Sequence, residues 1–299
     1  MNKYLINGQS YIPMKRILVP IDFSEEANNS IHFALKIAYK TGAKVFFFHA
    51  NHIPIVASDS PFSVYEAAAE SGEKAALEQL DSLKEKWERH LNLDKKTEIE
   101  TIVELGFAVE EILEVVDKKN IDLIIMATKG ASGIAKAFFG TNTERIIKSS
   151  NCPVLLIPDN YSYKDFNTIV LASDYNKINN PKTLAPLEEI ASVYNANILV
   201  FNSKKEKEYV PSYEEAIEGL ELEGKLSHIK HQYFFADNEN PIDAIDAFIE
   251  EKKADLLVLL PHAHTFFEKL FSKSITSEFA FHTKIPLLSL PDMSEPTIS

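Results

Sequence analysis

The sequence contains a single cysteine, Cys152, so no disulfide can form within one chain. Cys152 lies between Asn151 and Pro153, directly before an apolar run. A small apolar residue would serve equally well there, because an uncharged thiol packs as a hydrophobic group. We therefore expect a buried structural cysteine, with a redox role as the alternative.

The sequence also has no long apolar run and few basic residues. No stretch approaches the ~18 consecutive apolar residues of a membrane-spanning helix, and no basic segment followed by an apolar core opens the chain. Lysine and arginine number 31 against 44 acidic residues, which gives a formal net charge of −13. Such a surface repels phosphate backbones and anionic membranes. We expect a cytoplasmic protein that binds neither nucleic acid nor membrane.

Two nucleotide-binding motifs are missing. A nicotinamide dehydrogenase needs Gly-x-Gly-x-x-Gly after its first strand, whereas residues 20–24 contain no glycine. A P-loop enzyme needs a lysine between its last glycine and the following Ser or Thr, and here Gly140 is followed directly by Thr141. The first class is excluded, and rapid phosphoryl transfer lacks its usual machinery.

The chain has enough hydrophobic residues to form the cores of two domains. It has 299 residues, of which 45% are hydrophobic, and this length exceeds that of most single domains. Residues 1–13 fit no periodic element. We expect them to form an N-terminal extension without function, with Met14 as an alternative start.

Strand and helix patterns alternate from residue 17 onward. The expected strands are residues 17–21, 45–48, 99–103, 121–127 and 154–157. Apolar stripes at helical spacing lie between them, among them Leu77, Leu80, Leu83 and Trp87 in a long amphipathic helix. The charged stretch 70–89 is interpreted as the solvated face of that helix, with partner binding as the alternative. The alternation predicts an α/β fold with a doubly wound, Rossmann-like parallel sheet.

The pattern restarts in the second half of the chain. A shift of 133 positions places Asp122 on Asp255, and a shift of 152 positions places Asp22 on Asp174. The second copy is thus about nineteen residues shorter, and the missing part is expected around its second helix. We expect two tandem domains of the same fold, residues 14–158 and residues 166–292.

A loop with three glycines follows the fourth expected strand. Gly130, Gly133 and Gly140 precede Thr141, which has capping-box spacing to Glu144 and starts a helix. Ligands of open parallel sheets bind beyond the carboxyl ends of the strands, where this loop falls. Glycine allows a close approach to phosphate, and helix N-termini favour anions. The loop is either an anion cradle or a long loop that its glycines merely shape.

These residues resemble the nucleotide loop of the universal stress protein family, which runs Gly-x-x-Gly, nine residues, then Gly followed by Ser or Thr. Gly130, residues 131–139 and Gly140 with Thr141 match it, and Ala127 replaces the first glycine. The resemblance implies an adenine nucleotide α-hydrolase-like fold that binds ATP, with Mg²⁺ accompanying it.

The resemblance extends to residues 19–24, which are similar to the family's first strand and turn. It implies that Asp22 contacts the nucleoside; the alternative is that Asp22 caps the following helix. His49 receives no ligand role and is interpreted as a satisfied, half-buried histidine. The implied nucleotide site is Ile21, Asp22, Ala50, Met126, Thr128, Gly130, Gly133, Gly140, Thr141 and Asn142.

The second domain lacks this loop. At the corresponding positions stand Ala263, Phe266 and Lys273 in place of the three glycines, so we expect no ATP there. Family members associate through their last strands, and the resemblance implies that residues 154–157 and 286–290 pair within one chain, with a homodimer as a further assembly.

His262, His264 and His282 suggest zinc, but no Cys or suitably spaced carboxylate completes a ligand set, and surface histidines are the default interpretation.

The function predicted from the sequence is that of an ATP-binding regulatory stress protein. Its nucleotide is held by the first domain only, with at most slow hydrolysis. A nucleotide-free interaction scaffold of the same fold is the alternative.

Overall fold

The computed structural model describes residues 4–6, 9–11, 14–52, 62–91, 97–128, 141–173, 181–203, 222–224, 226–236, 241–260 and 284–291. The chain divides into two compact units, Met14–Cys152 and the combination of Met1–Pro13 with Pro153–Ser299. Within the described ranges, none of the helices combines the length and the apolar composition that a membrane crossing requires.

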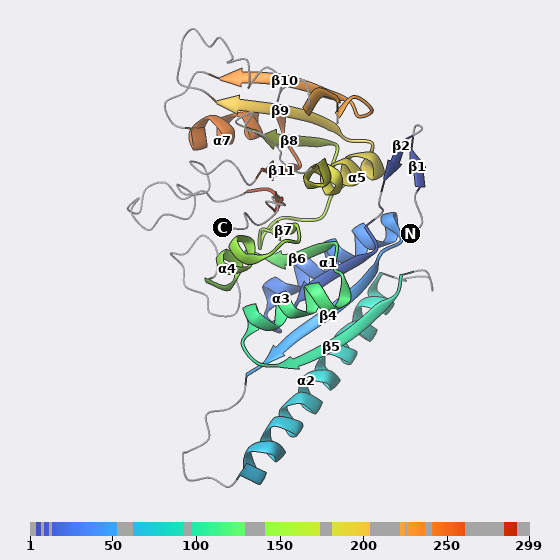
Figure 1. The fold of residues 1–299 in the computed structure, drawn as a ribbon, viewed down its shortest axis with the longest axis vertical. Helices are drawn as coiled ribbons and strands as arrows, with labels where there is room; N and C mark the ends of the chain where they lie inside the picture. The colour runs from blue at the N-terminus through green and yellow to red at the C-terminus, as the bar shows by residue number, and fades with distance from the viewer. Residues whose placement is uncertain are drawn as a thin grey trace, which may run out of the picture. The chain divides into compact units, whose positions relative to one another are not determined.

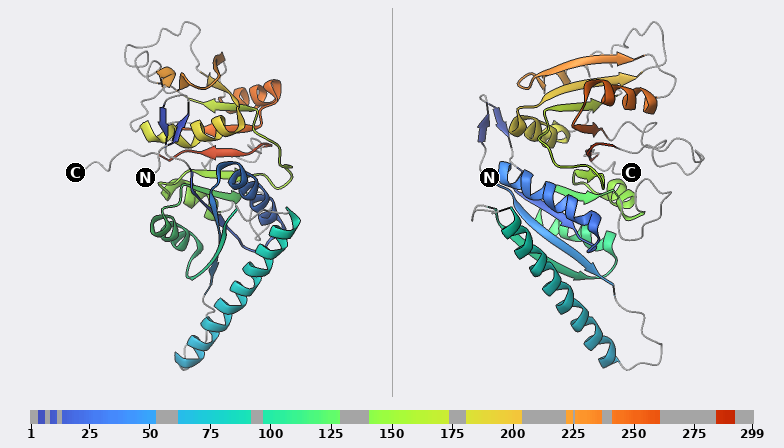
Figure 2. Two further views of the ribbon diagram at one scale, coloured as in Figure 1. Left: turned by 90° about the vertical axis from the view of Figure 1, so that its right-hand side faces the viewer. Right: turned by 180° about the vertical axis from the view of Figure 1, so that it is seen from behind.

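The unit Met14–Cys152 is built on a parallel sheet with the strand order β6-β3-β4-β5. Its strands are β3 (Arg16–Pro20), β4 (Lys44–Asn51), β5 (Ile99–Leu105) and β6 (Leu123–Ala127). Its helices are α1 (Glu25–Thr41), α2 (Phe62–His90), α3 (Ala108–Lys119) and α4 (Thr141–Ser149). Figures 1 and 2 show α1 and α2 on one face of the sheet and α3 on the other. The predicted α/β class, a mostly parallel sheet flanked by helices, is confirmed.

Helix α1 begins and ends where its sequence provides caps. The side chain of Ser24 accepts a hydrogen bond from the backbone N–H of Ala27, and Glu25 and Glu26 favour the positive end of the helix dipole. Gly42 ends the helix with φ of 74°, a conformation that costs glycine little, and its N–H donates to the carbonyl of Ala38 at 2.8 Å. Glycine just after a helical stripe is a typical stop signal, so this helix end can be read from the sequence.

The buried face of α2 differs from the predicted stripe. Leu80 and Trp87 are buried as expected, but Leu77 is 39% exposed and Ala76 is buried instead. The face that packs on β4 and β5 therefore passes through Ala76, one helical position away from Leu77. Charged side chains of the middle of α2, such as Glu73 and Glu78, are exposed, in agreement with a solvated face.

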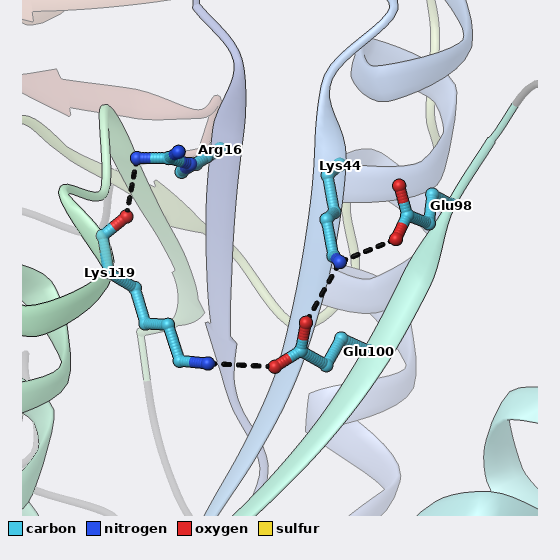
Figure 3. Close-up of polar contacts among 5 residues, drawn as sticks. All are labelled: Arg16, Lys44, Glu98, Glu100 and Lys119. Carbon is cyan, nitrogen blue, oxygen red and sulfur yellow. Dashed lines mark hydrogen bonds and ion pairs between the residues drawn. The ribbon is translucent and has the colours of Figure 1, made fainter.

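A polar network joins the amino ends of the strands in this unit (Figure 3). The ammonium group of Lys44 on β4 lies 2.5 Å from Glu98 and 2.8 Å from Glu100, and that of Lys119 lies 2.9 Å from Glu100. These two lysines, Lys44 first, hold the pKa of the Glu100 carboxyl below its usual value. The guanidinium of Arg16 donates to the carbonyl of Lys119 at 2.8 Å and so satisfies a carbonyl at the end of α3.

The unit that contains Pro153–Ser299 carries a sheet with the strand order β10-β9-β8-β11-β12-β7. The strands are β7 (Val154–Ile157), β8 (Thr168–Ala172), β9 (Asn197–Ser203), β10 (His231–Ala236), β11 (Leu256–Leu259) and β12 (Leu287–Ser289). The helical segments are the 3₁₀ turn η1 (Pro181–Leu184), α5 (Ala185–Tyr194) and α7 (Pro241–Lys252). Neighbouring strands are parallel except β12 and β7.

The elements of the two halves correspond at the spacings seen in the sequence. Helix α7 starts 133 positions after α3, β11 starts 133 positions after β6, and β8 starts 152 positions after β3. The connection between the second and third strands spans residues 52–98 in the first half and the shorter 204–230 in the second. The long helix α2 lies in the longer of these connections.

An aspartate at equivalent positions fixes the start of one strand in each half. Oδ2 of Asp122 accepts hydrogen bonds from the backbone N–H groups of Lys15 and Arg16 at 2.8 and 2.9 Å. Oδ2 of Asp255 accepts from those of Asn167 and Thr168, both at 2.9 Å. Each carboxylate therefore ties the entry of its own half's first strand to the start of the fourth.

Strands β7 and β12 pair antiparallel, with Leu156 opposite Leu287 and Val154 opposite Ser289. The predicted association of these two segments is confirmed. Both strands fall in the unit that contains Pro153–Ser299.

The prediction that residues 1–13 contain no regular element is wrong. Strands β1 (Tyr4–Ile6) and β2 (Gln9–Tyr11) pair antiparallel, with Tyr4 opposite Tyr11. The signal lies in the sequence: Asn7-Gly8 separates the strands, and this dipeptide favours the tight turns of β-hairpins.

Cys152 is 4% exposed, and its thiol donates to the carbonyl of Ile121 at 3.4 Å. Burial, followed by the charge of Asp122, raises the pKa of this thiol, which keeps it protonated. The predicted buried structural role is confirmed.

Asp246 on α7 faces a cavity of about 280 Å³ whose lining includes Glu250 and Lys284. Burial raises the pKa of Asp246 to about 6; Lys284 lowers it, and Asp243 and Glu250 raise it further. The folded state thus binds a proton more tightly than the unfolded state, so this group favours folding below pH ~4 and that contribution is lost as the pH rises through about 6.

We expect Asp246→Asn to raise the free energy of unfolding at pH 7 by about 1 kcal/mol, a value discounted because the carboxyl is half exposed. At pH 4 the two proteins should be equally stable. Urea unfolding from pH 4 to 7.5 measures the difference, and Glu251→Gln, an exposed change on the same helix, is the control. A difference that does not vary with pH would contradict the prediction.

Candidate functional site

A cavity of about 430 Å³ lies at the carboxyl ends of β3, β4 and β6. This volume falls within the range of about 300–1,000 Å³ typical of small-molecule sites. The strands and the residues directly after them contribute Pro20, Ile21, Asp22, Phe48, His49, Ala50, His52, Met126 and Ala127, and the helices contribute Ala27, Ala108, Ile112, Thr141, Asn142, Thr143 and Ile146. Because β6 and β4 lie on opposite sides of β3, the cavity sits where the order of the strands reverses, the usual ligand position in such sheets.

The wall of the cavity is largely apolar. Phe48, Ile112 and Ile146 are almost completely buried, and Met126 is 8% exposed. These side chains belong to β4, α3, α4 and β6, so the wall depends on the packing of all four elements. Such a surface suits the faces of a planar base or a sugar ring.

Asp22 brings a carboxylate to this cavity. It follows β3 directly, it is exposed, and its Oδ1 accepts hydrogen bonds from the backbone N–H and the hydroxyl of Ser24, at 3.1 and 2.5 Å. The helix cap is Ser24, so the alternative interpretation of Asp22 as the N-cap is wrong. Asp22 instead orients the residue that caps α1.

Two helices begin at the cavity. Thr141 and Asn142 are the first residues of α4, and Ala108 is the first residue of α3. The unpaired N–H groups and the dipole at a helix N-terminus attract anions. A 2.7 Å ion pair joins Glu110, in the first turn of α3, to Arg145, just after the first turn of α4. The arrangement can therefore bind a ligand that is apolar at one end and anionic at the other.

Two histidines of β4 and its end also reach the cavity. Nδ1 of His49 lies 2.7 Å from the carbonyl oxygen of Ile21, and its ring packs against Phe23 with centroids 4.6 Å apart. The interpretation of His49 as a satisfied, half-buried histidine is confirmed. His52 is exposed and meets the ring of Phe107 edge to face, with centroids 6.4 Å apart.

Six residues of the predicted nucleotide site line this one cavity: Ile21, Asp22, Ala50, Met126, Thr141 and Asn142. Thr128 follows β6 and is 6% exposed, and it is not among the lining residues. Gly130, Gly133 and Gly140 lie outside the described residues, as does the equivalent loop of the second half. For all ten residues of the predicted site, a role in nucleotide binding stays a prediction.

Sequence reasoning missed the contribution of α3. Ala108 and Ile112 line the cavity although neither follows β3, β4 or β6 directly. The strand-end rule offered a signal, because Ala108 comes soon after the carboxyl end of β5. Ile112 belongs to the buried face of α3, and its place at the cavity depends on how α3 packs on the sheet.

The residues that the structure describes hold no group of three or more His, Cys, Asp or Glu side chains arranged to bind a metal. His262, His264 and His282 lie outside them. Mg²⁺ in nucleotide sites is held by phosphates and one or two protein oxygens, with water completing the shell. Asp22 and Thr141 both line the cavity and carry oxygen atoms, the type of ligand that Mg²⁺ prefers.

Comparison with known proteins agrees with this geometry. Residues 13–158 match the model of the universal stress protein family. Universal stress protein MJ0531 of Methanocaldococcus jannaschii is 29% identical over 161 residues, which cover 52% of this chain and 88% of that protein.

Two solved structures are also similar to this chain, and the first of them shares its fold. A universal stress protein from Archaeoglobus fulgidus aligns with 94% of this chain and 98% of its own, with a TM-score of 0.61 and 17% identity. A family protein from Arabidopsis thaliana, solved with AMP bound, aligns with 49% of this chain and 92% of its own, with a TM-score of 0.33 and 18% identity. Residues 13–158, just under half of the chain, therefore form a domain of the universal stress protein family.

Proposed function

We propose that this chain is an ATP-binding regulatory protein that holds its nucleotide in the cavity beyond β3, β4 and β6. The observation that carries the proposal is the meeting of an apolar wall, a carboxylate at Asp22 and two helix N-termini in one cavity. The wall suits adenine and ribose, and the N-termini suit phosphates. Family membership of residues 13–158 adds support.

The proposal divides the chain into a nucleotide-binding domain at residues 14–158 and a second domain at residues 166–292 that binds no nucleotide. Loss of all three glycines in the second copy of the loop supports this asymmetry. In this division β7 closes the first domain and pairs with β12 of the second, so a fused pair takes the place of a dimer of single domains.

Regulation would work through α4. A ligand that contacts Thr141 and Asn142 orders the first turn of this helix. Binding of nucleotide would thereby alter the surface of α4 that a protein partner recognises. Hydrolysis is at most slow in this proposal, because the P-loop lysine is missing from the sequence. The competing function is a scaffold without nucleotide, which Ala127 in place of the family's first glycine favours.

The test is to denature the purified protein, identify any released nucleotide by mass spectrometry, and titrate the stripped protein with ATP and Mg²⁺ in a calorimeter. We expect about one ATP per chain. Two ATP per chain would contradict the asymmetry between the domains. No released nucleotide together with no titration heat would favour the scaffold.

Asp22→Ala should weaken ATP binding by about 1.5–3 kcal/mol, roughly 10- to 150-fold, the value of a hydrogen bond to a charged group. The substitution also removes the two hydrogen bonds between Ser24 and Asp22, which lowers the stability of the fold. Thermal unfolding is therefore measured alongside, to separate this effect from the change in affinity. Glu26→Ala, in the first turn of α1 but not in the cavity lining, is the control. If the Asp22→Ala variant bound ATP with native affinity, the carboxylate of Asp22 would not be part of the nucleotide site.

A further inference from the structure

The turn that carries Asp22 has an unfavourable backbone conformation. Phe23 has φ of 60°, in the left-handed region that residues with a Cβ avoid. Such a conformation costs on the order of 1–3 kcal/mol and persists only where the surroundings enforce it. The turn residues Ile21–Ser24 must therefore be held from outside.

Three hydrogen bonds made by the turn residues supply part of this restraint. The N–H of Ile21 donates to the carbonyl of Phe48 at 2.7 Å, which continues the pairing of β3 with β4 by one residue. On the other side, Ser24 donates twice to Asp22. None of these three hydrogen bonds involves Phe23, whose backbone conformation is the strained one.

His49 supplies the contact that does. It stands on the neighbouring strand β4, and its Nδ1 lies 2.7 Å from the carbonyl oxygen of Ile21. A carbonyl can only accept a hydrogen bond, so Nδ1 carries the hydrogen. The same ring packs against Phe23 at a centroid distance of 4.6 Å with an interplanar angle of 43°. His49 thus contacts the residues immediately before and after Asp22.

We propose that His49 is a positioning residue for nucleotide binding: it fixes Ile21 and Phe23 and thereby holds the carboxylate of Asp22 at the cavity. This inference deepens the proposed function and rests on it. A side chain that only filled space would need neither the donor at Nδ1 nor a contact on both sides of Asp22. The role of His49 is therefore transmitted through the turn rather than through a contact with the phosphates.

A double-mutant cycle tests this role. We expect His49→Ala to weaken ATP binding about 10-fold in the otherwise native chain, but less than 2-fold when Asp22 is already alanine, because two residues that act together are not additive. His49→Asn places an amide donor near the position of Nδ1 and should restore affinity to within about 3-fold. His90→Ala, an exposed histidine at the end of α2, controls for loss of an imidazole.

Nuclear magnetic resonance of the nucleotide-free protein gives an independent readout. Nitrogen shifts should show hydrogen on Nδ1 of His49. Exchange of the hydrogen-bonded amides of Ile21 and Ser24 should rise at least 10-fold in His49→Ala but little in His49→Asn. Equal losses of affinity with and without Asp22, or unchanged amide exchange, would overturn the proposal. A native chain that binds no ATP yet shows these exchange changes would instead refute the proposed function and retain the positioning of the turn.

Discussion

Replacing Asp255 with alanine is expected to lower the free energy of unfolding by about 3 kcal/mol. The carboxylate is 8% exposed; it accepts hydrogen bonds from the N–H groups of Asn167 and Thr168 and pairs with Lys164 at 2.6 Å. Alanine would leave two backbone donors without their acceptor, and each such loss in a partly buried place costs about 1–3 kcal/mol. Chemical denaturation monitored by circular dichroism measures the effect.

Two further variants separate the hydrogen bonds of Asp255 from its charge. Lys164→Ala removes only the half-exposed partner of the ion pair and should cost less than about 1 kcal/mol. Asp255→Asn keeps an oxygen acceptor, so its loss in the free energy of unfolding should lie between those of Lys164→Ala and Asp255→Ala. If Lys164→Ala were as destabilising as Asp255→Ala, the ion pair and not the strand entry would be the important contact.

The second large effect concerns the cavity. Ala50→Trp should reduce ATP affinity by at least about 100-fold, near 2.8 kcal/mol, because the indole would occupy space in the cavity that the base is proposed to fill. Ala50 lies near the end of β4, where partial exposure lets the larger side chain turn toward the cavity without entering the sheet core. Calorimetric titration with ATP and Mg²⁺ measures the loss.

Ala67→Trp is the matched control for this variant, since Ala67 is exposed on α2 and is absent from the cavity lining. We expect native affinity from it. Thermal unfolding of both variants shows whether the fold is retained. A folded Ala50→Trp protein that still binds ATP with native affinity would place the nucleotide elsewhere.

The sequence predicted those parts of the fold that depend on local patterns. Gly42 ends α1 because a positive φ favours glycine, and the strands of the parallel sheet follow the apolar runs. The face of α2 was less predictable, since Ala76 and Leu77 are both apolar neighbours and only packing on β4 and β5 selects one of them. The hairpin of β1 and β2 was predictable from Asn7-Gly8, but its short strands show no clear periodicity.

The site was predictable where it follows strand ends. Asp22 and Ala50 come from the ends of β3 and β4, and a motif resemblance added Thr141. Ile112 was not predictable in this way, because a helical stripe does not reveal which member meets a cavity. The contact of His49 was hidden for a different reason: its partner is the carbonyl of Ile21, and every residue has a carbonyl, so no sequence pattern marks the pair.

The burial of Cys152 has a practical consequence for spectroscopy. Maleimide dyes and spin labels react with exposed thiolates, and the only native thiol of this chain is enclosed and protonated. Cysteines introduced at exposed serines, such as Ser63 on α2 and Ser149 on α4, would be the positions that react. The native chain can thus serve directly as the background for measuring distances between pairs of labels, with and without nucleotide.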